Sequence, residues 1–276
     1  AQAFVELPSI PNDLQQELLF QVLEGINSSL TIQGAKLIGG HTLESRKISE
    51  EPYPLEIVSS LTVNGVIEDK NYFWSKGGMK KGDKILISRS LGTGIIFSAF
   101  MNGQVKPEIF DCVLKEMNKS QHYLVNKINK LADRNLNSKI VNACTDITGF
   151  GLLGHLSEML KSTNSDQSKM NLEPLKIILD LDHIPVYDGV KELLNKGFES
   201  SLAPSNEIFL KNINGDKNLR FELIYNDLNL NRSYYNMMLK ILIDPQTCGP
   251  LVVSCSSIYS EKLIQQGPWI QIGFVS

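Results

Sequence analysis

The stretch ACTDITGFGLLGH, from Ala143 to His155, constrains the fold more than any other part of the chain. Ile140 and Val141 predict the end of a buried strand just before it, and from Phe150 onward the apolar residues recur at helical spacing. The stretch therefore predicts a strand, a polar turn and a helix. The carboxylate of Asp146 lies in the turn, directly before the glycines that open the helix.

The chemistry of this turn predicts a bound divalent cation. Free N–H groups at the start of a helix favour phosphate, whereas the carboxylate of Asp146 would repel it. A cation between the two resolves the conflict, because magnesium is typically held by one or two carboxylates together with substrate phosphates. Asp146, flanked by the hydroxyls of Thr145 and Thr148, is therefore a candidate magnesium ligand.

Two alternatives stay open for the same residues. Gly149, Gly151 and Gly154 match the spacing G-x-G-x-x-G of a dinucleotide-binding unit, with Asp180 and Asp182 as the downstream acids. That fingerprint begins immediately after its strand and has its acid about 20 residues on, and this chain departs from it on both points. The second alternative is a plain helix cap in which small residues allow close packing.

The composition is that of a soluble globular protein. With 276 residues, 42% of them hydrophobic, the chain suggests about two domains. A net charge of −3 gives no electrostatic footprint for nucleic acid. No apolar run approaches the roughly 20 residues that span a bilayer, and no signal peptide is recognisable. We expect a cytoplasmic protein without nucleic-acid or membrane partners, whose four cysteines are reduced and mostly structural.

The first 70 residues predict a small α/β domain. A strand at Ala3 to Leu7 precedes a helix that starts at Asn12, with Gln15 as its capping-box partner. Further strands are predicted at Lys36 to Ile38 and at Leu55 to Val63.

Gly39, Gly40 and His41 follow the second of these strands. Two adjacent glycines let the backbone approach a ligand closely, and the imidazole can donate to a phosphate or a ribose. A plain turn with a surface histidine is the open alternative.

Residues 71–82 predict a linker, and residues 83–276 predict a second α/β domain. Its strand at Lys84 to Ser88 leads into LGTG, which either cradles an anion or serves close packing. Asp244, before a proline, is expected to form a turn rather than to bind a ligand. The remaining expectations are one long or broken helix at Pro107 to Leu131, a polar loop at Ser162 to Asn171, a strand at Leu175 to Leu181, a helix at Val186 to Leu194, an irregular excursion at Ser205 to Asn231, and strands at Leu251 to Ser254 and Ile270 to Val275.

Five short motifs follow one another along the chain: GGHT from Gly39, GD followed by LGTG from Gly82, ACTDITGFGLLGH from Ala143, DPQT from Asp244, and a terminal IG at Ile272. Together, over nearly the whole chain, they resemble the selenophosphate synthetase (selenide, water dikinase) family. That family is related to aminoimidazole ribonucleotide synthetase, thiamine-monophosphate kinase and a hydrogenase-maturation protein. The resemblance implies a two-domain α/β (α+β) fold whose first domain forms a barrel across a homodimer. It also implies phosphoryl transfer from ATP, with Mg²⁺, to selenide, giving selenophosphate, AMP and phosphate.

The resemblance assigns binding residues but no catalytic residue. Asp146 takes the place of the family's magnesium-binding aspartate. Gly39, Gly40 and His41 take the place of its nucleotide contacts, which the family supplies across the dimer.

The family's glycine-rich loop, with its reactive cysteine or selenocysteine and lysine, and most of its metal-binding aspartates have no counterpart here, so we expect a truncated N-terminal domain. Cys248 and Pro250 in DPQTCGP also depart from the family pattern. Three hypotheses follow. The chain is a fragment, or part of a larger polypeptide such as a fusion to an upstream redox domain, and is inactive in isolation; or it is a non-catalytic nucleotide-binding and dimerisation module; or it is a related ATP-using enzyme that acts on a purine precursor or thiamine phosphate.

Overall fold

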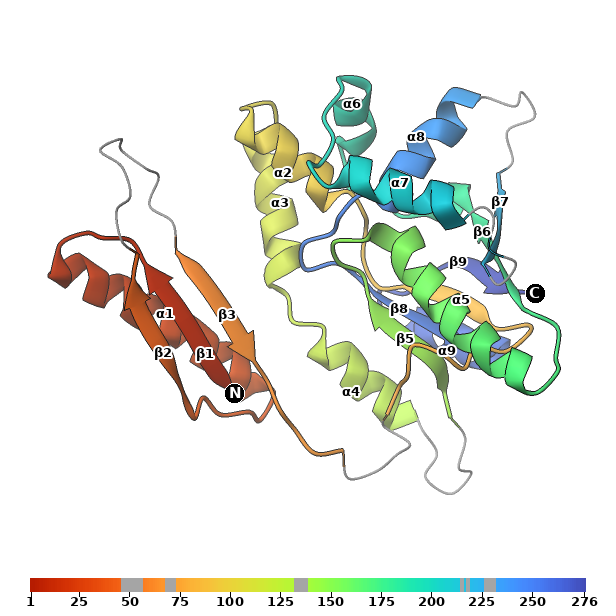
Figure 1. Cartoon of the computed structure of the whole chain (residues 1–276), viewed down its shortest axis with the longest axis horizontal. Coiled ribbons are helices and arrows are strands. Elements are labelled where there is room, and N and C mark those ends of the chain that lie inside the picture. The colour runs from red at the N-terminus through yellow and green to blue at the C-terminus, as the bar shows by residue number, and fades with distance from the viewer. Residues whose placement is uncertain (46–56, 68–72, 132–138, 214–215, 217–218, 226–231) are drawn as a thin grey trace. The chain divides into compact units, whose positions relative to one another are not determined.

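The chain forms two compact units, Ala1–Glu68 (unit 1) and Asp69–Ser276 (unit 2). The computed structural model describes residues 1–45, 57–67, 73–131, 139–213, 216, 219–225 and 232–276. Each unit folds around a sheet of its own (Figure 1). The predicted mixed α/β class is confirmed.

Unit 1 is a three-stranded sheet with a long helix on one face. The strand β1 (Gln2–Leu7) lies in the middle, parallel to β2 (Gly39–Glu44) and antiparallel to β3 (Val58–Thr62). Every second residue of β1, from Ala3 to Leu7, is buried, and the helix α1 (Asn12–Ile32) packs against this strand. This alternation is the period-2 pattern that predicted the strand.

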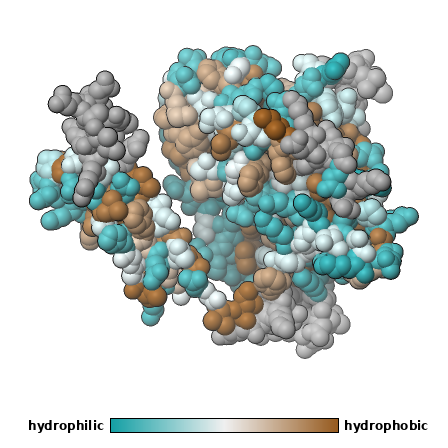
Figure 2. Space-filling view, viewed as in Figure 1, coloured by the Kyte–Doolittle hydropathy of each residue, from teal (hydrophilic) through white to brown (hydrophobic). Residues whose placement is uncertain are grey.

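Hydrophobic side chains also reach the surface of unit 1. Ile38, Leu61 and Val63 are exposed, and Figure 2 shows hydrophobic residues among the hydrophilic ones on this part of the surface.

Two expectations for unit 1 are wrong. The second strand begins at Gly39 rather than at Lys36, because Gly39 and Gly40 themselves pair with Gln2 and Ala3 of β1. A Cβ on Gly40 would lie 1.9 Å from the carbonyl oxygen of Ala3, so the pairing requires a glycine there.

The predicted capping box is also absent. The N-cap of α1 is Pro11, and the Gln15 amide instead donates to the carbonyl of Pro8 at 2.9 Å. Leu55, expected to begin the third strand, lies outside the described residues.

Unit 2 is built on a six-stranded mixed sheet of order β5-β8-β4-β9-β6-β7. Its strands are β4 (Lys84–Ile87), β5 (Val141–Asp146), β6 (Lys176–Asp180), β7 (Arg220–Ile224), β8 (Leu251–Cys255) and β9 (Ile270–Val275). Adjacent strands are antiparallel except for β6 and β7, which are parallel.

Helices cover both faces of this sheet (Figure 1). They are α2 (Thr93–Met101), α3 (Pro107–Asn118), α4 (His122–Leu131), α5 (Gly151–Lys169), α6 (Val190–Asn195), α7 (Ala203–Ile213), α8 (Arg232–Ile243) and α9 (Ser257–Gln266), with a 3-10 turn at Leu181–His183. The larger core joins one sheet face to α2, α5, α6 and α8. A second core joins the other face to α4 and α9.

Several boundaries in unit 2 differ from the expectations. The strand before the central turn runs on to Asp146 rather than ending at Val141, and the helix expected from Val186 begins at Val190, after Gly189 at φ 81°. The helical region from 107 to 131 is broken into α3 and α4, which was one of the predicted forms.

Two predicted loops are wrong. Residues 162–169 of the expected polar loop at 162–171 instead form the last part of α5. There the buried Asn164 side chain exchanges hydrogen bonds with the main chain of Leu175 at 2.8 and 2.9 Å. In the expected irregular excursion at 205–231, the chain forms most of α7 and all of β7, and residues 214–215, 217–218 and 226–231 lie outside the description.

The described part of the expected linker packs on unit 2. The main-chain N–H of Gly78 donates to the Thr163 hydroxyl at 3.1 Å, and Met79 is buried. The role of residues 71–82 as a linker between domains stays a prediction.

Candidate functional site

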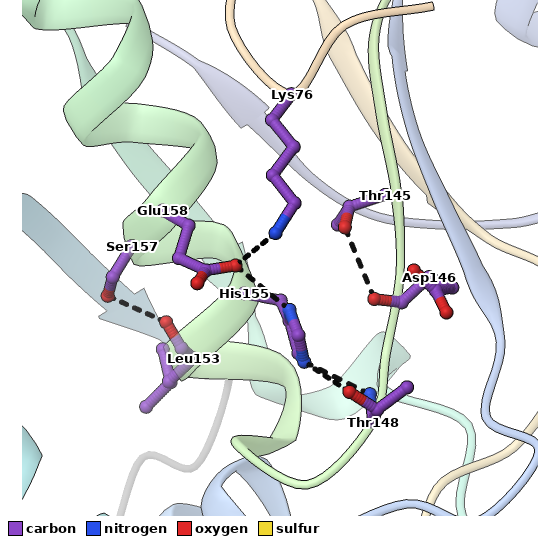
Figure 3. Close-up of polar contacts among 8 residues, drawn as sticks. All are labelled: Lys76, Thr145, Asp146, Thr148, Leu153, His155, Ser157 and Glu158. Carbon is purple, nitrogen blue, oxygen red and sulfur yellow. Dashed lines mark hydrogen bonds and ion pairs between the residues drawn. The ribbon is translucent and has the colours of Figure 1, made fainter. Parts of the chain in front are cut away.

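Asp146 is the last residue of β5, and its side chain is exposed. Its neighbours Thr145 and Ile147 are buried, and the N–H of Ile147 donates to the carbonyl of Pro250 at 2.9 Å. Within the described part of the chain, no hydrogen bond or ion pair engages the Asp146 carboxylate, and Figure 3 shows only its main-chain oxygen in contact, with the Thr145 hydroxyl. The carboxylate is therefore available to a ligand.

The helix α5 begins five residues later, at Gly151. Gly151 opens the helix at φ 68°, where a Cβ would lie 2.6 Å from the main chain of Ile243, so a glycine is required. The helix has no side-chain cap, and the N–H of Gly151 donates to the carbonyl of Thr148 at 3.1 Å. The following N–H groups of the first turn are those that a helix start can offer to an anion. Asp146 thus lies shortly before a helix start that has no side-chain cap, and its role as a magnesium ligand stays a prediction.

A chain of polar contacts holds the loop between Asp146 and α5 (Figure 3). The N–H and the hydroxyl of Thr148 lie 3.1 and 3.0 Å from Nε2 of His155. Nδ1 of His155 lies 3.2 Å from Oε2 of Glu158, and that oxygen accepts from Nζ of Lys76 at 2.6 Å. His155 is buried, whereas Glu158 and Lys76 are partly exposed.

The electrostatics of this chain keep Glu158 ionised. Partial burial acts to raise the pKa of the Glu158 carboxyl, but the hydrogen bond and charge of Lys76, together with His155, outweigh it and lower that pKa below its ordinary value.

The LGTG loop before α2 is already occupied by the protein's own acceptors. Oδ2 of Asp244 accepts from the N–H groups of Gly94 and Ile95 at 3.0 and 3.4 Å. Oε1 of Gln246 accepts from the N–H groups of Gly92 and Thr93 at 3.0 and 3.3 Å. Of the two predicted roles for this loop, close packing is the one that the structure supports.

Asp244 is 1% exposed. Its carboxylate caps the start of α2 and is not a binding group at the surface. Burial raises the pKa of its carboxyl to about 7 against the opposing effect of the hydrogen bonds that it accepts. Its second oxygen, Oδ1, is buried without a hydrogen-bond partner in the described structure.

Gly39, Gly40 and His41 belong to unit 1, at the start of β2. Gly40 and His41, with Phe4 and Ser60, line a shallow hollow of about 300 Å³ on the sheet. The His41 ring is stacked near Phe4, with centroids 6.4 Å apart. Their assignment to nucleotide contacts stays a prediction.

The donor set fits a metal shared with a ligand rather than one enclosed by this chain. Among the residues that the structure describes, no three His, Cys, Asp or Glu side chains cluster as metal ligands. One free carboxylate beside an uncapped helix start is instead the arrangement expected when phosphate oxygens complete the coordination of Mg²⁺.

The four cysteines are free. Burial, and secondly the charge of Asp146, raise the pKa of the Cys144 thiol to about 12. Burial, and secondly Asp83, raise the pKa of the Cys255 thiol to about 12. Cys112 and Cys248 are exposed. The thiols of Cys144 and Cys255 are therefore poor nucleophiles at neutral pH.

Sequence reasoning gave no role to His155, Glu158, Lys76 or Gln246. The i, i+3 spacing of His155 and Glu158 on a helix was a usable signal. The sequence also gave no role to Asn206. Its side-chain amide donates to the carbonyls of Gly149 and Ile243 at 2.8 and 2.9 Å, and so links the turn before α5 to the end of α8.

Within the described residues, no helix is long and apolar enough to cross a membrane.

Residues 80–191 match the family model "AIR synthase related protein, C-terminal domain".

Curated relatives carry the name "Selenide, water dikinase". That of Treponema denticola is 32% identical over 93% of this chain and 60% of its own length. That of Caldanaerobacter subterraneus is 31% identical over 91% and 60%, and that of Clostridioides difficile is 28% identical over 92% and 61%. The chain therefore spans about 60% of the length of these relatives.

Solved structures share the fold. The Escherichia coli hydrogenase maturation protein HypE superposes with a TM-score of 0.59 at 13% identity, over 99% of this chain and 66% of HypE. Thiamine monophosphate kinase from Aquifex aeolicus superposes with a TM-score of 0.53 at 14% identity, over 100% of this chain and 70% of the kinase.

Proposed function

We propose that this chain, a homologue of the selenide, water dikinases with an AIR synthase-like α/β fold, is a selenophosphate synthetase-like domain that binds ATP with Mg²⁺ for phosphoryl transfer to selenide. The homology confirms the resemblance drawn from the motifs. The observation that carries the proposal is the unengaged Asp146 carboxylate beside the uncapped start of α5.

In this proposal, Asp146 holds the cation and the first turn of α5 orients the phosphates. Phosphoryl transfer requires positioned donors and neutralised phosphate oxygens, with little covalent work by the protein. Mg²⁺, when bound, supplies that neutralisation. The Asp146 carboxylate is free of other partners among the described residues, so it can bind the cation directly. Gly39, Gly40 and His41 are the proposed nucleotide contacts of unit 1.

We further propose that the isolated chain makes no selenophosphate. Cys144 and Cys255 are disfavoured as thiolates by burial. Cys112 is exposed and has Lys115 three residues on, but it lies within helix α3 and not in a glycine-rich loop. Cys248 is exposed and has no lysine three residues on. In this proposal the chain supplies the part of the site that binds phosphate, at Asp146 and the start of α5, and it supplies no activated nucleophile.

Two other functions are kept as alternatives. The first is a non-catalytic nucleotide-binding and dimerisation module. The second is a related ATP-using enzyme, in keeping with neighbours that were solved as a thiamine monophosphate kinase with AMPPCP and TMP and as HypE with ATP. Likeness to these structures supports a shared fold and leaves the phosphoryl acceptor to experiment.

Two measurements test the proposal. Calorimetric titration of the chain with ATP is expected to show binding in Mg²⁺ and none in EDTA, and no binding in either would refute it. Turnover by the product of the complete open reading frame is expected to give selenide-dependent AMP. ADP release with another acceptor would favour the related enzyme, and binding without turnover would favour the module.

A further inference from the structure

We propose that His155 is a positioning residue, which holds the loop between Asp146 and α5 in place as the neutral tautomer with its proton on Nδ1. The inference deepens the proposed function, because the loop it fixes is the proposed Mg²⁺-ATP site. Its geometric part rests on contacts within unit 2 alone (Figure 3).

The tautomer follows from the partners of the ring. A main-chain N–H can only donate, so Nε2, 3.1 Å from the nitrogen of Thr148, must accept and carries no proton. The proton of the neutral ring is then on Nδ1, which donates to Glu158 at 3.2 Å. In the other tautomer, with the proton on Nε2, the N–H of the ring would point at the main-chain N–H of Thr148.

The same argument fixes the direction of the Thr148 hydroxyl. Because Nε2 carries no proton, the hydroxyl 3.0 Å away must donate to it. Its lone pairs are then the part that remains for a ligand. A hydroxyl oriented in this way suits a cation or the water bound to it, and not a phosphate oxygen.

Glu158 and Lys76 hold the ring in this orientation. Glu158 accepts from Nδ1, and Lys76 binds the same carboxylate oxygen at 2.6 Å. The His155 side chain is 6% exposed and its ring lies 5.8 Å from that of Phe150. Rotation of the ring would break the contacts at both nitrogens, so the burial and the two partners together fix one state.

Thr148 is consequently held on all its polar groups. Nε2 of His155 accepts from the N–H and the hydroxyl of Thr148. The carbonyl of Thr148 accepts from the N–H groups of Gly151 and Gln246 at 3.1 and 3.0 Å. This threonine lies midway between Asp146 and the first turn of α5. Fixing it fixes the spacing between the carboxylate and the helix N–H groups.

Three variants and one control separate the contacts. His155→Phe removes both nitrogen contacts. His155→Gln keeps an acceptor for Thr148 but cannot also reach Glu158, and Glu158→Gln keeps an acceptor for Nδ1 without the charge. Ser157→Ala is the matched control, because this buried hydroxyl on the same helix donates to the carbonyl of Leu153 at 2.7 Å, within the helix itself.

The direct test is nitrogen NMR of the 276-residue chain labelled on its histidine rings. The signals lost in His155→Gln are expected to show a protonated Nδ1 and an unprotonated Nε2 at neutral pH. A proton on Nε2, or on both nitrogens, would overturn the assignment.

Hydrogen exchange then tests the positioning. The amides from Thr148 to Leu152 are expected to exchange about tenfold faster in His155→Phe, less so in His155→Gln and Glu158→Gln, and at the original rate in Ser157→Ala. Equal rates in His155→Phe and the unchanged chain would contradict the role.

Titration with Mg²⁺-ATP connects the loop to the proposed function. Binding is expected to weaken about tenfold in His155→Phe and to stay unchanged in Ser157→Ala; unchanged binding in His155→Phe would overturn a role in the site. If the unchanged chain does not bind Mg²⁺-ATP at all, the proposed function fails, while the NMR and exchange results still decide the positioning of the loop.

Discussion

Replacing Asp244 by asparagine should remove a pH-dependent loss of stability from unit 2. The pKa of this buried carboxyl is raised to about 7, against about 3.9 for an unfolded aspartate. An acid whose pKa is raised by folding stabilises the fold fully below the unfolded pKa, and the contribution is lost as the pH rises toward the folded pKa. The full difference corresponds to about 4 kcal/mol.

Between pH 5 and pH 7 this linkage predicts that the unchanged chain loses about 2 kcal/mol of unfolding free energy relative to Asp244→Asn. Asp244 now accepts hydrogen bonds from the N–H groups of Gly94 and Ile95 and from the side-chain amide of Gln246, at 3.0, 3.4 and 2.9 Å. Asparagine keeps an oxygen that can accept from the same three donors. It carries no charge to desolvate. Only the difference between the two proteins is used, because other carboxylates titrate in both.

The assay is guanidinium denaturation of both proteins at pH 5, 6, 7 and 8, followed through the unfolding of unit 2. Asp244→Ala serves as the control, because it leaves these donors without their acceptor and should be less stable than Asp244→Asn by about 1–3 kcal/mol at every pH. A difference between Asp244→Asn and the unchanged chain that stays constant from pH 5 to pH 8 would refute the burial argument.

Three further predictions concern unit 1 and activity. Gly40→Ala should break the pairing of β1 and β2, since its Cβ would meet the Ala3 carbonyl at 1.9 Å, whereas a Cβ on Gly39 meets nothing within 4 Å; circular dichroism melting should show unit 1 destabilised by Gly40→Ala and nearly unchanged by Gly39→Ala. The chain should form a homodimer, because the three-stranded sheet has open edges and exposed apolar residues; a monomeric mass by sedimentation at tens of micromolar would count against it. The isolated chain should release no selenide-dependent AMP, and robust release seen by phosphorus NMR would disprove the cysteine argument.

Local patterns predicted the central strand, turn and helix well. The helical spacing from Phe150 onward and the glycines before it determine α5 directly, and the exposed Asp146 is placed by the end of β5. Glycine-rich punctuation was less reliable. A plain turn was the open alternative for Gly39 and Gly40, but they form part of β2, because they pair with β1 and the local pattern does not reveal which strands pair.

Contacts between distant segments could not be predicted. Gln246 accepts from Thr93, 153 residues earlier, and Lys76 binds Glu158, 82 residues later. The segment 205–231 showed no clean period, yet α7 forms there in part because Asn206 bonds to the turn and to α8. These partners are set by the tertiary fold, which local propensity does not encode.

Asp146 is the residue that we propose binds the cation that ATP requires. Asp146→Asn keeps the size and capping ability of the side chain and removes its charge. Asp166→Asn is the matched control, because Asp166 is an exposed residue of helix α5 whose ion pair with Lys169 is a surface one.

Calorimetric titration with ATP in Mg²⁺ is the measurement. We expect binding to weaken at least tenfold in Asp146→Asn and to be unaffected in Asp166→Asn, with the ligand-free melting temperature unchanged in both. Because ligand binding raises apparent stability, the upward shift of the melting temperature by Mg²⁺-ATP should also disappear in Asp146→Asn. Equal binding of Mg²⁺-ATP by Asp146→Asn and the unchanged chain would contradict the assignment.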